Sequence, residues 1–335
     1  MPVVMKNETR MKNIRMIGKT SLRKARCRTA TRRALAIIVG IGLLICAGFT
    51  AAADIPLPPV NLGDTSFQDG IAFPGWLIEE TLGYNHASRI NDHSGNALAG
   101  SNKFTSVSAA THVAYISNFR LLGGFYGAEI LLPLADVDLN TSGPKDREQG
   151  VGDLIVSPFI LQWTDHKLFG MPYYHRFVFD ITLPTGSYDR NHAVNAGNNM
   201  VSINPYYAFT IIPADKLEFS VRLHYLWNSR NDAPYTGLGV GTVQPGQAFH
   251  ANYAASYEVI HGVRLGLNGY ALQQLSEDRI NGRSQDNSQE RVFGIGPGIQ
   301  YSNNGVSLYL NSYFETGAEN RSEGTKIIFR LSKAF

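Results

Sequence analysis

Ten charged, imidazole and amide side chains occupy alternate positions within otherwise apolar runs of this 335-residue sequence. They are Arg176, Asp180, Glu218, Arg222, His224, His250, Asn252, Glu258, Arg264 and Asn268. Charges of both signs on neighbouring strands can pair across the strands. Such a set either lines a path for solutes and sets its selectivity, or forms a structural network that fills a closed interior. We predict that these side chains face an enclosed polar space, and we favour the lining of a path.

The sequence offers little support for catalysis or metal binding. Its nine histidines show no H-E-x-x-H motif and no paired spacing that would converge on a metal. Ser220, His224 and Glu258 could form a Ser-His-acid set, but such a triad is identified by geometry and their spacing does not favour one. Glycine-rich runs at 237–241 and 294–298 lack the following helix that a phosphate loop needs. We therefore predict no catalytic residue, no metal and no cofactor.

The elements that must position the polar set are runs with a two-residue period. In 217–227, Phe219, Val221 and Leu223 alternate with polar residues, as expected for a strand with one apolar and one polar face. About twelve runs of this kind occur, at 76–84, 105–116, 124–134, 153–163, 176–183, 200–211, 217–227, 249–258, 263–274, 292–301, 306–315 and 324–335. An even number is typical of single-chain bacterial barrels, with ten or fourteen strands as the alternatives here.

The connections between these runs alternate in length. Long polar segments occupy 85–103, 135–149, 187–199, 228–246 and 275–290, with a shorter one at 316–323. Tight links lie between them, at 117–123, 212–216, 260–262 and 302–305, and 164–173 is a longer member of this second set. Outer-membrane barrels have long extracellular loops and short periplasmic turns, whereas a soluble sandwich has no reason to sort its loops in this way. The pattern predicts that both termini are periplasmic.

The first 53 residues have the composition of a cleavable secretory signal. Eleven of the 30 Lys and Arg residues precede an apolar run at 34–45, which leads to Ala51-Ala52-Ala53. The alternative is a membrane anchor, since 34–53 is long enough for a marginal span. Removal of 1–53 changes the formal net charge from +3 to −7, so the basic character belongs to targeting and does not indicate nucleic-acid binding. It also removes both cysteines, Cys27 and Cys46.

The rest of the chain divides into two parts. Residues 54–75 are proline-rich and non-repeating, which excludes a central strand, so we expect them either in the periplasm or inside the barrel as a plug. Residues 76–335 form the predicted barrel. Because the bilayer admits only helices and closed sheets, we predict an all-β, antiparallel, up-and-down transmembrane β-barrel in the outer membrane of a Gram-negative bacterium.

Aromatic residues near strand ends are consistent with interfacial girdles. They are Trp76, Tyr84, Tyr115, Trp163, Tyr188, Tyr206, Tyr207, Tyr225, Trp227 and Tyr301. The chain ends in an alternating apolar run that closes with Phe335, which resembles the signal read by barrel-assembly machinery. The expected partners are therefore outer-membrane lipid and lipopolysaccharide, the assembly machinery during biogenesis, and small hydrophobic solutes, with no nucleic acid.

An ordered series of short motifs resembles one known family. The motifs are Gly150-Val151-Gly152-Asp153-Leu154 with Pro158, Leu183-Pro184-Thr185-Gly186-Ser187-Tyr188, Asn204-Pro205, Gly269-Tyr270 with Gln274, Gly296-Pro297-Gly298, and Gly317-Ala318-Glu319-Asn320-Arg321 with Gly324. Together they resemble the meta-pathway phenol-degradation family of outer-membrane transporter-like barrels. Ser322-Glu323 departs from the Pro-Gln that the resemblance would lead us to expect. The resemblance implies uptake of aromatic or other small hydrophobic compounds.

Three hypotheses for function follow from this sequence. The first is a passive channel for small hydrophobic or aromatic compounds. The second is a structural or adhesive barrel without a pore, and the third is a lipid-acting barrel enzyme. About eight strands give a filled interior and sixteen an open channel, so twelve strands fit a narrow or plugged path. We favour the channel.

Overall fold

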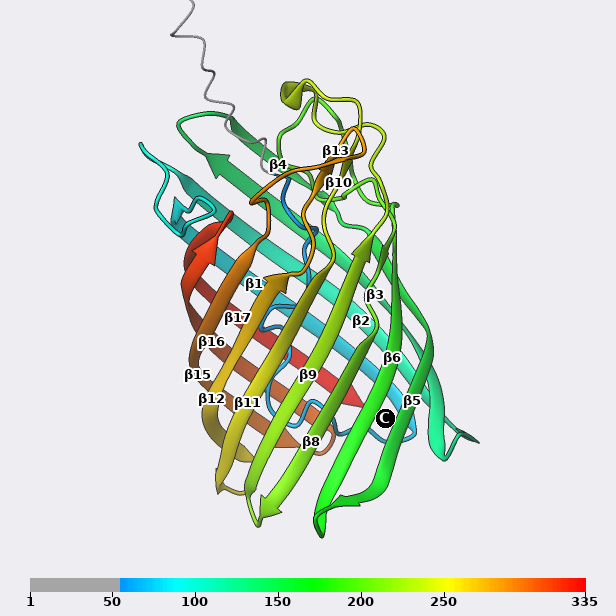
Figure 1. Cartoon of the computed structure of the whole chain (residues 1–335). Helices are drawn as coiled ribbons and strands as arrows, with labels where there is room; N and C mark the ends of the chain where they lie inside the picture. The colour runs from blue at the N-terminus through cyan, green and yellow to red at the C-terminus, as the bar shows by residue number, and fades with distance from the viewer. Residues whose placement is uncertain (1–54) are drawn as a thin grey trace, which may run out of the picture. The chain divides into compact units, whose positions relative to one another are not determined.

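The computed structural model describes residues 55–335, and the predicted signal sequence lies outside this range. Twelve long antiparallel strands form one closed ring, in which β1 pairs with β17 and β9 pairs with β11 (Figure 1). They are β1 (Gly75–Ile90), β2 (Lys103–Leu121), β3 (Gly124–Asn140), β5 (Leu154–Leu168), β6 (Met171–Leu183), β8 (Tyr206–Ala214), β9 (Leu217–Asn228), β11 (Ala248–Ile260), β12 (Val263–Gln274), β15 (Arg291–Asn303), β16 (Val306–Glu319) and β17 (Ser322–Ala334). The predicted twelve-stranded barrel is confirmed.

Shorter elements lie at the extracellular end of the ring. They are β4 (Lys145–Val151), β7 (Ser202–Ile203), η1 (Thr236–Leu238), β10 (Val243–Gln244), β13 (Arg279–Ile280) and β14 (Arg283–Ser284). Strands β10, β13 and β14 form a separate three-stranded sheet above the barrel (Figure 1). No helix among residues 55–335 is long and apolar enough to cross a membrane.

The barrel has an apolar outer surface because its strands alternate. On β9, Phe219 and Tyr225 are exposed, whereas Glu218, Ser220 and Arg222 at intervening positions are buried in the interior. Large exposed apolar side chains recur on the other strands, among them Leu82, Val107, Ile130, Phe249, Leu267, Ile295, Leu310 and Phe329. Water-soluble proteins rarely expose apolar surface of this extent, whereas acyl chains accommodate it readily. One expected girdle residue is misplaced, since Tyr206 faces the interior and is 3% exposed.

The connections at one end of the barrel are tight hairpin turns. Three of them have consecutive residues with positive φ: Leu122 (51°) with Gly123 (80°), Phe169 (52°) with Gly170 (82°), and Asn304 (48°) with Gly305 (75°). Positive φ at both central residues is the geometry of type I′ turns, whose twist matches that of the flanking strands. The segment 164–173, expected to be longer, also closes tightly, because β5 and β6 continue to a two-residue link at Phe169-Gly170. We assign this short-turn end to the periplasm, because outer-membrane barrels have short periplasmic turns and long extracellular loops.

The strands extend further toward the extracellular side than the sequence pattern indicates. Segment 135–149, expected as a loop, is a hairpin in which the outer half of β3 pairs with β4. Polar cross-strand pairs maintain it, for example the two hydrogen bonds that Arg147 donates to Asp136. Segment 316–323 is likewise a tight turn at Asn320-Arg321. These runs lack apolar alternation because both of their faces lie outside the bilayer, so hydrophobic periodicity could not reveal them.

The outer surface generates a prediction about depth in the membrane. Leu267, in the middle of β12, is 57% exposed, and Ile260, at the periplasmic end of β11, is 65% exposed. We expect Leu267→Arg to lower the free energy of unfolding by about 2–4 kcal/mol, and Ile260→Arg by about 0–1 kcal/mol, because the cost of a charge is greatest at the bilayer midplane. Denaturant unfolding in lipid vesicles measures both values. Equal costs for the two variants would contradict the assignment of the outer face to lipid.

Candidate functional site

The interior of the barrel contains a segment that is not part of its wall. Residues 55–74, here called the lumen segment, run through the ring from its extracellular end to the start of β1 (Figure 1). The amide of Leu57 donates to Glu290 beside the extracellular end of β15 (2.6 Å), and the amide of Gly70 donates to Thr210 on β8 (2.9 Å). Of the two locations expected for the proline-rich region, the structure therefore has the one inside the barrel.

The upper part of the lumen segment is held by apolar contacts. Leu57, Val60 and Leu62 pack against a buried cluster on β12, β15, β16 and β17. That cluster includes Tyr270, Leu272, Val292, Tyr313, Ala318 and Ile328. The hydroxyl of Tyr313 donates to the carbonyl of Gly63 (2.7 Å), so one side chain contributes both packing and a hydrogen bond. Prolines leave this stretch extended and without internal hydrogen bonds, so its polar groups need partners on the wall.

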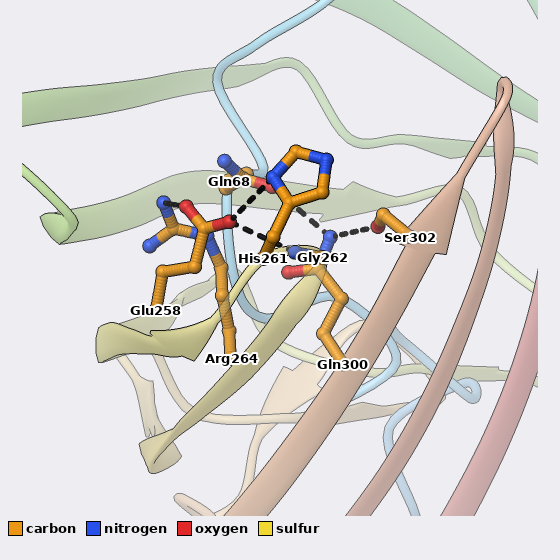
Figure 2. A pocket seen from close by; sticks show the side chains of 7 residues that line it. All are labelled: Gln68, Glu258, His261, Gly262, Arg264, Gln300 and Ser302. Carbon is orange, nitrogen blue, oxygen red and sulfur yellow. Dashed lines mark hydrogen bonds and ion pairs between the residues drawn. The ribbon is translucent and has the colours of Figure 1, made fainter.

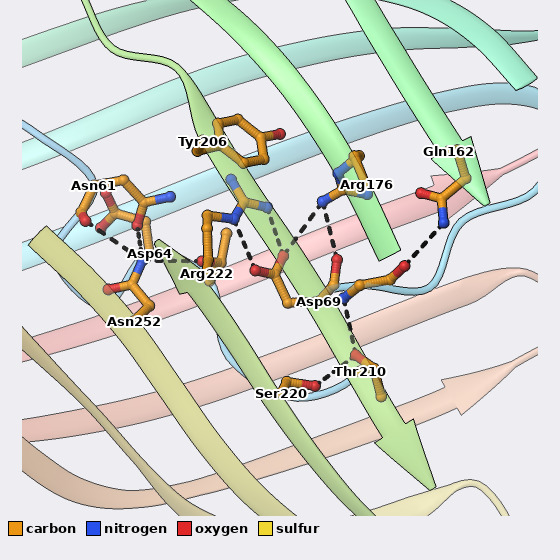
Figure 3. A network of polar contacts seen from close by, with 12 residues as sticks. Asn61, Asp64, Asp69, Gln162, Arg176, Tyr206, Thr210, Ser220, Arg222 and Asn252 are labelled. Atoms are coloured by element: carbon orange, nitrogen blue, oxygen red, sulfur yellow. Dashed lines mark hydrogen bonds and ion pairs between the residues drawn. The ribbon is translucent and has the colours of Figure 1, made fainter. Parts of the chain in front are cut away.

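The lower part of the lumen segment is held by a buried ion cluster centred on Asp69. Arg222 donates two hydrogen bonds to the Asp69 carboxylate, from Nε (2.7 Å) and from a terminal nitrogen (2.5 Å), as Figure 3 shows. Arg176 donates to the Asp69 carbonyl (2.9 Å) and lies 3.5 Å from its carboxylate. A carboxylate held by the two nitrogens of one guanidinium is among the strongest side-chain pairings. The cluster ties the lumen segment to β6 and β9.

Amide side chains of the wall satisfy the backbone of the lumen segment. Asn252 accepts from the amide of Gly63 (2.8 Å) and donates to the side chain of Asn61 (2.7 Å). On the opposite side, Gln162 donates to the carbonyl of Gly70 (3.0 Å) (Figure 3). A Cβ on Gly70 would lie only 2.3 Å from the backbone nitrogen of Thr210, so the close approach to β8 requires glycine. The contacts extend over most of the segment's length.

The last strands contribute wall residues that the sequence analysis missed. Lys326 donates to the carbonyl of Leu62 (2.6 Å) and to Asp64 (3.1 Å), and Arg330 donates to the carbonyl of Asp64 (3.3 Å). Asn311 of β16 donates to Ser66 (3.0 Å). Their signal was present, since Lys326 and Arg330 alternate with outward-facing Ile327 and Phe329. Alternation alone does not distinguish these two residues, because the same strand ends in an apolar run that closes with Phe335.

A second polar network joins the walls of β2, β3, β5 and β6. His112 lies 3.1 Å from Glu129, and the hydroxyl of Tyr206 donates to the same carboxylate (3.2 Å). Ser157 donates to Asp180 (2.5 Å) and is within 3.4 Å of Glu129. Tyr206 also lies beneath the guanidinium of Arg222, whose central carbon is 4.2 Å from the ring centroid. This ring therefore connects the second network to the ion cluster at Asp69.

The ten residues singled out in the sequence occupy different parts of the interior. Arg176, Arg222 and Asn252 hold the lumen segment, and Asp180 belongs to the second network. Glu218 is fully buried and accepts hydrogen bonds from Ser220 and Ser256. Whether the set lines a path for solutes stays a prediction.

The other members lie above and below the ion cluster. His224 and His250 stack with ring centroids 4.1 Å apart and are 2% and 0% exposed. Asn268 is equally buried on β12, and no hydrogen-bond partner to its side-chain amide lies within residues 55–335. Glu258 and Arg264 pair at 3.5 Å near the periplasmic turn, where Glu258 also accepts from the amide of Gly262 (2.9 Å).

The structure does not assemble the Ser-His-acid set. Ser220 is hydrogen-bonded to Glu218 and Thr210, and Glu258 is engaged by Arg264 and the turn. In the described part of the chain, neither ring nitrogen of His224 has a hydrogen-bond partner. A triad requires the base to contact both the nucleophile and the acid, so these three residues do not form one. Residues 55–335 also contain no group of three or more His, Cys, Asp or Glu side chains arranged to hold a metal.

Long loops interlock over the extracellular end of the barrel. Residues 184–201, 229–247 and 275–290, here called the extracellular cap, are joined by hydrogen bonds such as Tyr188 to the carbonyl of Ala233 (2.8 Å) and the pairing of β10 with β13. Within the cap, Asp278 accepts from the amide of Gly246 (2.8 Å) and from Gln274 (2.7 Å). Burial raises the pKa of Asp278 from 3.8 to about 7, although the Gly246 hydrogen bond acts in the opposite direction.

The fold defines a class of protein, the outer-membrane β-barrel. The COG4313 outer membrane channel from Pseudomonas putida F1 is similar in structure, with a TM-score of 0.71 and 17% identity over 83% of this chain and 100% of that chain. The family model described as "Putative MetA-pathway of phenol degradation" matches residues 87–331, so the chain belongs to this family. The family resemblance drawn from the sequence motifs is confirmed.

Two further barrels are similar only in general architecture. The transport unit of the autotransporter AIDA-I from Escherichia coli has a TM-score of 0.46 and 11% identity over 78% of this chain and 90% of that chain. The TodX monoaromatic hydrocarbon channel, solved as a deletion mutant, has a TM-score of 0.41 and 10% identity over 79% and 91%. Similarity at this level reflects the barrel alone. No curated protein sequence matches the chain.

The raised pKa of Asp278 predicts that the cap is more stable in acid. Because the native cap binds this proton more tightly than the unfolded loop does, the stabilisation is full below the ordinary pKa of 3.8 and is lost as pH rises through about 7. We expect residues 275–290 to exchange amide hydrogens faster at about pH 8.5 than at about pH 5, after correction for intrinsic exchange. In the Asp278→Asn variant, whose side chain is neutral at every pH, the faster exchange at the higher pH should vanish. The same pH dependence of exchange in the wild type and the variant would contradict the assignment of this effect to Asp278.

Proposed function

We propose that this protein is a passive outer-membrane channel for small, uncharged aromatic or other hydrophobic compounds. In this proposal the lumen segment narrows the path, and the inward-facing polar side chains of the wall line it. Membership of a family described by phenol degradation supports the substrate class. The channel-type fold supports the mode of action, since a closed twelve-stranded ring is wider than one that its own side chains fill.

One observation carries the proposal. The polar wall residues Arg222, Asn252 and Lys326 bond to the lumen segment rather than to the wall on the opposite side. The barrel therefore does not close its interior with its own strands. A separate, extended piece of chain occupies the space, and its displacement would expose the polar side chains of β6, β9, β11 and β17 that now hold it.

The charge arrangement favours uncharged solutes. Asp69 faces Arg222 and Arg176, and Glu79 faces Arg330 at 3.6 Å, so these buried charges of both signs are paired within a few ångströms. Such pairing leaves no strong net field of one sign, so neither cations nor anions are concentrated in the path. Small neutral molecules avoid the cost of desolvation that an ion would meet in a narrow lumen.

The ion cluster predicts how conductance responds to mutation. Asp69→Ala leaves Arg222 and Arg176 buried without their carboxylate, which costs about 3–5 kcal/mol for a buried pair, so the lumen segment should leave its position. Planar-bilayer recordings of the refolded barrel should then show larger single-channel steps than the wild type. Asp64→Asn is the matched control, because Asp64 lies in the same segment with a partly exposed carboxylate and contacts Lys326 at 3.1 Å. Its conductance should stay near that of the wild type.

Other outcomes would favour the rival functions. If neither Asp69→Ala nor deletion of residues 55–74 produced discrete steps, the barrel would be structural or adhesive rather than a channel. Release of fatty acid from added lipid would support a lipid-acting enzyme. For the wild-type channel, Arg176→Ala and Arg222→Ala should change conductance and ion preference, and unchanged values would contradict the assignment of these residues to the path. Liposome swelling with phenol and with a sugar of similar size tests the substrate class.

A further inference from the structure

Two hollows on the barrel differ in position and in chemical character. One lies at the periplasmic rim, where polar side chains such as Glu258, Arg264 and Gln300 line it (Figure 2). The other, here called the outer groove, has a volume of about 420 Å³, is mainly apolar and opens toward the bilayer. It lies on the outer face of the neighbouring strands β11, β12, β15 and β16 (Figure 1). Its lining includes Phe249, Ala271, Gln273, Arg291, Phe293 and Gly317.

A β-bulge in β16 opens one side of the outer groove. Arg291 of β15 lies opposite Glu319 of β16, and Phe293 lies opposite Thr316. Between these two pairs, one residue of β15 therefore faces two residues of β16. Gly317 at the bulge has a φ of +65°, and in the described part of the chain a Cβ there would meet no atom within 4 Å. A left-handed glycine is typical of one class of bulge, and here it leaves open space on the outer face.

Two alanines between aromatic rings form the apolar part of the outer groove. Ala271 of β12 lies opposite Ala251 of β11 on one side and opposite Phe293 of β15 on the other. Phe249 and Phe293 are large, exposed side chains of the outer face. The ring of Phe293 stacks on Tyr253 with centroids 5.9 Å apart, which holds that wall in place. The recess between the rings suits a hydrocarbon chain, since a cavity of roughly 150 Å³ already holds a benzene molecule.

A polar row borders the outer groove on its extracellular side. Gln273 of β12 lies opposite Arg291, which lies opposite Glu319. Gln273 is six residues beyond Leu267, in the middle of β12. At about 3.3 Å per residue and a strand tilt of about 40°, the row lies about 15 Å from the bilayer midplane. Because the apolar band of such barrels is about 25 Å tall, the row lies at the headgroups of the outer leaflet, and the groove lies just beneath them.

Arg291 has hydrogen-bond donors available for a phosphate at this level. Its side chain is 51% exposed, and one terminal nitrogen donates to Glu319 (2.5 Å). A guanidinium carries five N–H donors in a fork that matches phosphate oxygens, so the remaining donors can bind a second anion. Lipid A, the membrane anchor of lipopolysaccharide, combines phosphates at the headgroup level with several acyl chains below them. Its chemistry matches an arginine above an apolar recess.

We propose that the outer groove binds one acyl chain of lipid A, while Arg291 donates hydrogen bonds to a phosphate of the same molecule. The groove opens to the outer leaflet, where lipopolysaccharide is located, and a lipid of the inner leaflet would not reach it. The recess accepts the hydrocarbon, and the polar row above it fixes the depth of the headgroup. This site depends on the location of the barrel in the outer membrane and not on the passage of solutes.

Native mass spectrometry of the full-length barrel in detergent measures how much added lipid stays bound. The probes are phosphorylated lipid A, lipid A without its phosphates, and phosphatidylglycerol, and we expect phosphorylated lipid A to be retained best. Arg291→Gln should weaken the binding of phosphorylated lipid A by about fivefold to tenfold, as expected for a lost hydrogen bond to a charged group. It should leave the binding of the form without phosphates unchanged. Ala271→Trp fills the groove and should lower the retention of both forms.

Two matched variants make the result specific. Ala109→Trp adds the same ring on the outer face of β2, where Ala109 lies between the exposed side chains of Leu82 and Leu134. Arg147→Gln removes another exposed arginine that is paired with a carboxylate, that of Asp136. Both variants should retain lipid A as the wild type does. A change in electrophoretic mobility on heating shows that each variant was folded.

Three outcomes would count against the site. Equal retention of lipid A by the wild type and the Ala271→Trp variant would overturn the proposal. Equal retention of phosphatidylglycerol and lipid A by the wild type would also overturn it, because the groove would then be a general site for acyl chains. If Arg291→Gln weakened both forms of lipid A to the same extent, the assignment of Arg291 to the phosphate would be wrong.

Discussion

A closed antiparallel ring forces every second side chain into an interior where water is scarce, and charges placed there need partners. In this protein several of the partners come from the lumen segment, which lies inside the ring but is not one of its strands. Asp69 joins Arg222 to Arg176, and Asn252 satisfies backbone groups of the lumen segment. Because an isolated buried charge is far more costly than a paired one, wall and segment stabilise each other. The need to pair buried polar groups thus explains both why the wall is polar on the inside and why a segment of chain occupies the lumen.

The same alternation divides the molecule into surfaces with distinct roles. Outward positions such as Leu267 and Leu310 are apolar and meet lipid, while the inward positions between them hold the lumen segment. Beyond the bilayer this division ends, and polar pairs such as Asp136 with Arg147 extend the strands into hairpins. The interlocked loops of the extracellular cap, such as the contact of Tyr188 with Ala233, then cover the outer end of the barrel.

Docking of the lumen segment combines two kinds of contact with different character. Its upper half packs apolar residues such as Leu62 against Tyr270 and Tyr313, which is tolerant of small shifts. Its lower half depends on directed hydrogen bonds to Asp69 and on the close approach of Gly70 to β8. These contacts do not tolerate small shifts.

The sequence by itself determined the class of fold, because period-two alternation and the sorting of loops by length follow directly from a strand that has lipid on one side. It also identified Arg176, Arg222 and Asn252 as inward-facing, since facing is a local property of the strand. Only the tertiary structure decided what these residues contact. The pairing of Asp69 with Arg222 joins positions 153 residues apart, and no local pattern encodes such a distance. The location of the proline-rich segment and the contacts of Lys326 and Arg330 were decided in the same way. They depend on which strands the closed ring brings together around one extended piece of chain.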